Sequence, residues 1–217
     1  MRTTLKERVL PAYTRGEEIF NMVTHIVGGA IGIGAVLACV ITAALRGNVW
    51  GIVSGSIYGA SVIILYTMSS IYHGLTAPLA KKVFQIFDHC TIFIMIAGTY
   101  TPISLLGIGG AQGWVYFGIE WAMAILGVIL YSLKRTAMRR VEIAIYIIMG
   151  WAIIIGFRRL WDNVPRLSSF LLLGGGAIYT LGTLWYRRRH RRLSHVIWHV
   201  HVIGGAACHW LSLWLMS

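Results

Sequence analysis

Several histidines stand in apolar stretches of the chain, where ionisable residues are costly and usually mark a functional site. His195 and His199 are four residues apart, so both imidazoles project from one face of a helix and can share a metal ion. This spacing alone is a weak signal. If His73 lies at the same depth, it adds a third nitrogen, and three histidines with a water form the open site of a catalytic zinc.

Two further side chains could act on a metal-bound water. Ser69 lies four residues before His73 on the same helical face, and could hydrogen-bond that water or a substrate oxygen. Asp88 is the nearest carboxylate, able to orient the water and accept its proton. Asp88 and Ser69 are therefore the candidate catalytic residues. Alternatively, the polar side chains only hydrogen-bond helices together. Haem fits less well, because its axial ligands face each other across a macrocycle.

A second polar stripe follows one face of the first apolar stretch. It consists of Glu18, Asn21, Thr24 and His25. Two interpretations are open: the stripe forms a second layer around the metal, or it anchors the start of the helix, with Glu18 near the positive end of the helix dipole.

The other histidines are not expected to bind the metal. His89 and Cys90 follow Asp88 on other faces of the helix, and we expect them to pack or to form hydrogen bonds. The remaining three lie in a basic loop, away from the ligand face or near the far end of a span: His190, His201 and His209. The cysteines are few and far apart in apolar runs, so they specify neither a disulfide framework nor a metal motif.

The elements that carry these residues are predicted to be membrane-spanning helices. Of the 217 residues 57% are hydrophobic and 12% are charged, whereas soluble domains have roughly 25% charged residues. This composition excludes a cytosolic enzyme, a secreted disulfide scaffold and a disordered chain. We predict one all-α membrane domain over residues 1–217, with residues 1–18 as a cytoplasmic segment. Its seven predicted spans are residues 20–45, 50–73, 86–107, 113–133, 141–157, 167–186 and 195–216.

The distribution of Lys and Arg predicts the orientation. The net charge of +12 comes mostly from short basic clusters between apolar runs, which indicates a membrane protein rather than a nucleic-acid binder. With the N-terminus in the cytoplasm, that side carries 15 Lys and Arg and the other side carries 4, so we expect the C-terminus outside. At about 1.5 Å of rise per residue, His73, Asp88, His195 and His199 then all lie within about 12 Å of a cytoplasmic charge cluster.

Together these motifs resemble the hemolysin III family, the bacterial branch of the progestin and adipoQ receptor superfamily that includes the adiponectin receptors. The resemblance rests on Glu18-x-x-Asn21-x-x-Thr24-His25, Ser69-x-x-x-His73, Phe87-Asp88-His89-Cys90, Ala97-Gly98-Thr99-Tyr100-Thr101-Pro102 and His195-x-x-x-His199. It implies a multi-pass protein of the bacterial inner membrane with seven helices. It also implies a Zn²⁺ near the inner leaflet, with His73, His195 and His199 as ligands and Asp88 and Ser69 beside the zinc-bound water.

The leading hypothesis is a zinc-dependent intramembrane hydrolase of a lipid amide or ester, linked to membrane lipid homeostasis. Relatives in the superfamily are associated with ceramide hydrolysis, so a ceramidase-like substrate is implied by resemblance only. One alternative is a non-enzymatic sensor of membrane lipids with a structural zinc. Another is a pore-forming hemolysin, which needs a hydrophilic path that the outer half, with little beyond Glu120 and His209, does not supply. Membrane lipids, not nucleic acids, are the expected partners.

Overall fold

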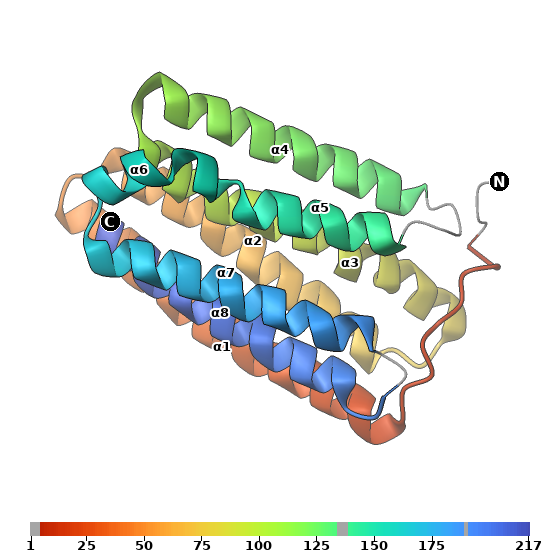
Figure 1. Cartoon of the computed structure of the whole chain (residues 1–217). Helices are drawn as coiled ribbons and strands as arrows, with labels where there is room; N and C mark the ends of the chain where they lie inside the picture. The colour runs from red at the N-terminus through yellow and green to blue at the C-terminus, as the bar shows by residue number, and fades with distance from the viewer. Residues whose placement is uncertain (1–4, 134–138, 189–190) are drawn as a thin grey trace.

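The computed structural model is a bundle of long helices and describes residues 5–133, 139–188 and 191–217 (Figure 1). No strand occurs among these residues, and seven helical stretches are long and apolar enough to cross a membrane. The elements are α1 (Arg15–Leu45), α2 (Val49–Gly74), α3 (Pro78–Pro102), the π-helix η1 (Ile103–Ile108), α4 (Gly110–Ser132), α5 (Arg139–Trp151), α6 (Ile153–Asn163), α7 (Arg166–Arg187) and α8 (Ser194–Met216). The predicted all-α, seven-span membrane fold is confirmed.

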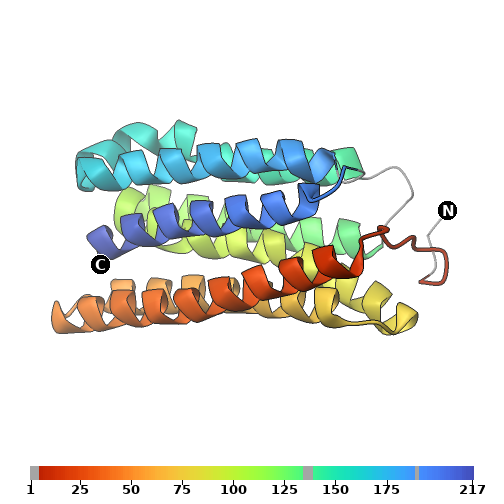
Figure 2. The same cartoon turned by 90° about the horizontal axis from the view of Figure 1, so that it is seen from below.

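The last helix, α8, packs against both α1 and α7, and Figure 2 shows it between them. The chain enters α1 at one end of the bundle, and α8 ends at the opposite end. The start of α8, the start of α3 and the end of α2 therefore meet at the end where α1 begins, which brings the predicted site residues to one level.

Two spans differ most from the predicted boundaries. The third begins at Pro78 rather than at residue 86, because proline suits a first helical turn and Lys81 finds partners there. The Lys81 ammonium donates to the carbonyl oxygens of Tyr72 at 3.1 Å and Leu75 at 3.0 Å, at the end of α2. The fifth span consists of α5 and α6 and continues to Asn163, past Arg158, whose side chain lies on the exposed face of α6.

A close approach between η1 and α4 requires a glycine. A Cβ atom on Gly113 would collide with the backbone carbonyl oxygen of Ser104, which cannot rotate away as a side chain could. Gly118, on the exposed face of the same helix, has no atom within 4 Å of its ideal Cβ position.

The contrast between Gly113 and Gly118 leads to a prediction about thermal stability. We expect Gly113→Ala to lower the melting temperature of the detergent-solubilised protein, because overpacking costs about 1–3 kcal/mol and exceeds the gain of roughly 1 kcal/mol in helix propensity. Gly118→Ala is the control and should melt at or above the wild-type temperature. Equal melting of the two variants by tryptophan fluorescence would show that η1 does not pack closely on α4.

Candidate metal centre

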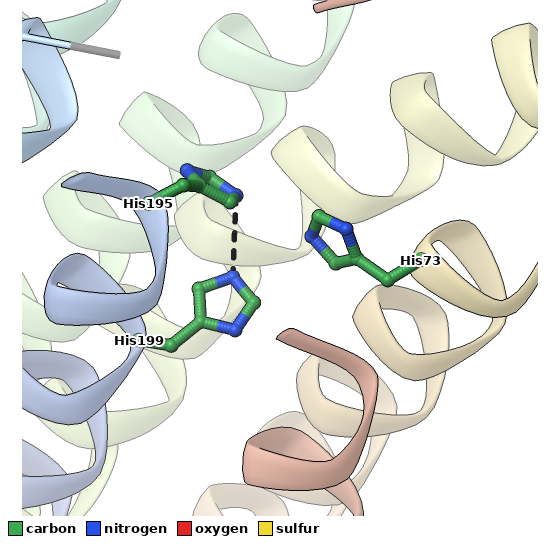
Figure 3. Close-up of side chains that lie close together, drawn as sticks. All are labelled: His73, His195 and His199. Atoms are coloured by element: carbon green, nitrogen blue, oxygen red, sulfur yellow. Dashed lines mark hydrogen bonds between the residues drawn. The ribbon is translucent and has the colours of Figure 1, made fainter. Parts of the chain in front are cut away.

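Three buried histidines meet at the end of the bundle where α1 begins. His73 comes from α2, and His195 and His199 come from the first two turns of α8 (Figure 3). One ligand nitrogen from each ring lies within 4.8 Å of the others, and the Nε2 atoms of His195 and His199 are 3.2 Å apart. Nitrogen ligands about 2.0–2.1 Å from a tetrahedral zinc are themselves about 3.3 Å apart. The His195–His199 pair is therefore near the spacing of zinc ligands, and the three rings together could hold a metal ion.

His73 is oriented by a carboxylate from α1. Its Nδ1 donates to Glu18 Oε2 at 2.6 Å, and the other oxygen of Glu18 pairs with the Lys81 ammonium at 2.9 Å. The Nε2 atom of His73 is buried and has no hydrogen-bond partner among the residues that the structure describes. A carboxylate on one ring nitrogen and an open second nitrogen is the arrangement of many zinc-bound histidines.

His199 is oriented by α1 as well. Its Nδ1 donates to the carbonyl oxygen of Asn21 at 3.2 Å, which leaves Nε2 toward the other two histidines. The Thr24 hydroxyl lies 3.3 Å from that Nδ1, and the His25 ring stacks on His199 with centroids 3.7 Å apart. Of the two interpretations of the α1 stripe, these contacts favour a supporting layer around the ligands.

The anchor at the start of α1 is a different residue, Glu17. Thr14 and Glu17 form a capping box, in which the backbone N–H of Thr14 donates to Glu17 Oε2 at 2.9 Å. The other oxygen, Oε1, accepts from the backbone N–H of Leu193 at 2.7 Å, directly before α8. One side chain thus ties the start of α1 to the start of α8 and places His195 beside the α1 stripe. The Thr14-x-x-Glu17 spacing is a sequence signal for the capping box but not for the contact with Leu193.

Ser69 and Asp88, the predicted catalytic residues, border the same cavity as His195 and His199. About 990 Å³ of space here is not filled by protein atoms, a volume that includes space open to the surroundings. The Ser69 hydroxyl is buried and has no hydrogen-bond partner in the described part of the chain. Away from the histidines the walls are largely apolar, with Leu65, Ile92, Met95, Ile96, Ile147, Trp151, Tyr179 and Val202 among the lining residues.

Tyr13, before α1, covers the histidines and was not singled out in the sequence. Its ring stacks on His195 with centroids 5.0 Å apart and lies 6.0 Å from the His73 ring. An aromatic residue outside the apolar runs carries no local signal of such a contact, because the contact depends on the path of the chain before α1.

The other histidines and the cysteines are placed elsewhere. His201 Nδ1 donates to the Ile197 carbonyl oxygen on its own helix at 2.7 Å, and His209 Nε2 donates to the Leu172 carbonyl oxygen at 3.2 Å. His190 lies outside the described residues. The cysteines are not disulfide-bonded; Cys39 and Cys90 are buried and Cys208 is partly buried.

Comparison with known proteins agrees with the motifs. The chain is 36% identical over 191 residues to Hemolysin-3 of Bacillus cereus, which covers 88% of this chain and 87% of the relative. It is 36% identical over 197 residues to the Hemolysin-3 homolog of Bacillus subtilis (strain 168), covering 90% and 92%. The human Monocyte to macrophage differentiation factor is 26% identical over 222 residues, covering 98% of this chain and 85% of that protein. The family model described as Haemolysin-III related matches residues 13–210, so the chain belongs to the hemolysin III family.

Proposed function

We propose that this protein is a zinc-dependent hydrolase that cleaves an amide or ester bond of a membrane lipid. The observation that carries the proposal is the buried set of three imidazole nitrogen atoms within 4.8 Å of one another. Two of these histidines, His195 and His199, line a cavity that Ser69 and Asp88 also border. Three histidines leave the fourth position of a tetrahedral zinc open, which is typical of catalytic rather than structural sites.

Each residue of the site has a defined part in the reaction. When bound, zinc would acidify a coordinated water and polarise the substrate carbonyl. Asp88 would accept the proton released during attack and return it to the leaving nitrogen or oxygen. The Ser69 hydroxyl, which has no partner in the described structure, would donate to the carbonyl oxygen as negative charge develops on it. Glu18 would hold His73 in its ligating orientation.

The cavity supports a lipid as the substrate. Its walls are largely apolar and suit a hydrocarbon chain, while Ser69, Asp88 and the histidines supply polar groups at the same cavity. A lipid amide such as ceramide is the substrate that the superfamily resemblance implies, and a bacterial lipid ester would satisfy the same chemistry.

The direct test is product formation by purified protein. We expect zinc-loaded protein in lipid nanodiscs to release fatty acid from a long-chain amide or ester, as measured by mass spectrometry, and a zinc chelator to stop the release. If no amide or ester is cleaved by fully zinc-loaded protein, the hydrolase proposal fails. The cluster would then support the alternative of a lipid sensor whose zinc ties α2 to α8.

The hemolysin names of the Bacillus relatives raise the possibility of a pore. A pore needs a continuous polar path through the bilayer. The cavity described here becomes largely apolar away from the histidines, and Glu120, in α4, is buried and not among its lining residues. The structure therefore gives a pore less support than a lipid-binding hydrolase.

The proposed orientation places the metal centre at the cytoplasmic side of the bacterial inner membrane. We expect a reporter fused after Ser217 to be active outside the cytoplasm and one inserted after Arg188 to be active inside, because the asymmetry of Lys and Arg sets the topology. Alkaline phosphatase and green fluorescent protein fusions distinguish the two sides. The opposite pattern would place the histidines at the outer leaflet.

A further inference from the structure

A second polar cluster lies beside the metal centre and joins three helices. His89 of α3 donates from Nδ1 to Glu142 Oε1 of α5 at 2.7 Å. The Tyr146 hydroxyl lies 3.1 Å from the same carboxylate oxygen and 3.0 Å from the His89 carbonyl oxygen. The Tyr186 hydroxyl, on α7, lies 3.4 Å from that carboxylate oxygen and 3.0 Å from His89 Nδ1. Glu142 is 5% exposed, although it stands at the start of an apolar span.

These contacts fix the tautomer of a neutral His89 ring. The Glu142 carboxylate oxygen lies within hydrogen-bond distance of His89 Nδ1 and of both tyrosine hydroxyls, and an ionised carboxylate accepts hydrogen bonds but donates none. The proton of a neutral His89 therefore lies on Nδ1, and Nε2 carries a lone pair. The ring plane is held by Tyr131, which stacks on His89 with centroids 4.8 Å apart and an interplanar angle of 11°.

The lone pair of Nε2 is available to a ligand of the cavity. His89 borders the cavity together with Asp88 and His195, and no hydrogen bond within the described structure reaches its Nε2 atom. The Tyr186 ring lies 6.2 Å from the His195 ring, so the second cluster adjoins the metal centre. A ligand with a hydrogen-bond donor binds more tightly here than one without, because a ligand that lacks the donor leaves the Nε2 acceptor buried without a hydrogen bond.

We propose that His89, held by Glu142, is a binding site for the polar end of a lipid that carries an O–H or N–H donor. The lipid donates to His89 Nε2 while its hydrocarbon chain occupies the apolar part of the cavity. The inference rests on the proposed function only in taking the ligand of the cavity to be a lipid. His89 acts by recognition, so its effect is measurable with ligands that have no bond to cleave.

The test compares two such ligands, hexadecanol and hexadecyl methyl ether, which differ in the single donor. We expect the wild-type protein in detergent to bind the alcohol about tenfold more tightly than the ether, since a lost hydrogen bond of about 1.4 kcal/mol corresponds to that factor. The preference should persist after zinc is removed with a chelator, because His89 rather than the metal recognises the hydroxyl. Competition with a fluorescent fatty alcohol gives both dissociation constants.

The variants assign the preference to His89. His89→Phe keeps an aromatic ring against Tyr131 but has no acceptor, and should bind alcohol and ether within about threefold of each other. His201→Phe is the matched control, since it makes the same exchange at a histidine of α8 that is not among the lining residues of the cavity, and it should retain the wild-type preference.

Equal binding of the two ligands by the wild type would overturn the inference without relying on the folding of any variant. An alcohol preference that survives in folded His89→Phe, or that disappears with zinc, would also overturn it. These outcomes are independent of turnover. A protein that prefers the alcohol but cleaves no lipid would refute only the hydrolase, and a hydrolase without the preference would refute only the role of His89.

Discussion

Purified protein is expected to contain about one zinc ion per chain, and replacement of both His195 and His199 by Ala is expected to abolish zinc binding. The two ligand nitrogens of this pair are 3.2 Å apart, and the third, on His73, completes a set within 4.8 Å. A metal ion bound by one nitrogen of each ring satisfies all three buried imidazoles together. The double variant leaves one ligand, which cannot retain zinc during purification.

Inductively coupled plasma mass spectrometry on detergent-purified protein measures the metal content directly. His201→Ala is the matched control, because His201 is on the same helix but its Nδ1 bonds to the backbone of Ile197 instead of facing the other rings. It should keep about one zinc. Full zinc content in the His195→Ala, His199→Ala double variant would refute the assignment of these ligands, and a zinc-free wild type would refute the metal centre.

The depth of the site residues could be predicted because it depends on local quantities. The rise per helical residue and the positions of Lys81 and Arg192 place His73 and His199 at a similar distance from the same membrane face. The four-residue spacing of His195 and His199 then fixes a shared helical face. These inferences need no knowledge of which helices are neighbours, and the structure brings the three predicted ligands together.

The supporting contacts were harder to predict because they depend on helix neighbours. The Glu18 contact with His73 requires α1 beside α2, and Glu142 meets His89 only because α5 packs near α3. Nothing in the apolar periodicity of a span specifies which helices pack against it in the bundle. Glu142 nevertheless carried a signal, since an ionisable residue at the start of an apolar stretch is costly unless it has a partner.

Boundaries were least predictable where charged residues are inside helices. The sequence treats Lys81 and Arg158 as the ends of spans, because charges are unfavourable in lipid. In the structure Lys81 is buried with its ammonium on the carbonyl oxygens that end α2, while Arg158 lies on the exposed face of α6. The carbonyl oxygens at a helix end and the length of an arginine side chain both permit a charge where composition alone predicts a stop.

Replacement of Asp88 by Asn is expected to separate catalysis from metal binding. The substitution keeps the size of the side chain and some of its hydrogen bonding, and Asp88 is not among the proposed ligands. Zinc content and melting temperature should therefore change little. A general base typically contributes about 10²- to 10⁴-fold in rate, so turnover of a susceptible lipid amide or ester should fall by about that factor.

Two further variants make the Asp88→Asn result interpretable. His73→Ala should lose both zinc and turnover, whereas Asp162→Asn, which removes a carboxylate from the exposed face of α6, should lose neither. If the protein is instead a zinc-stabilised sensor, Asp88→Asn should still rescue a membrane-fluidity phenotype in cells while His73→Ala fails. Normal turnover and normal rescue with Asp88→Asn would together refute the role of this carboxylate. A general base that can be removed without a loss of rate does not transfer the proton in the rate-limiting step.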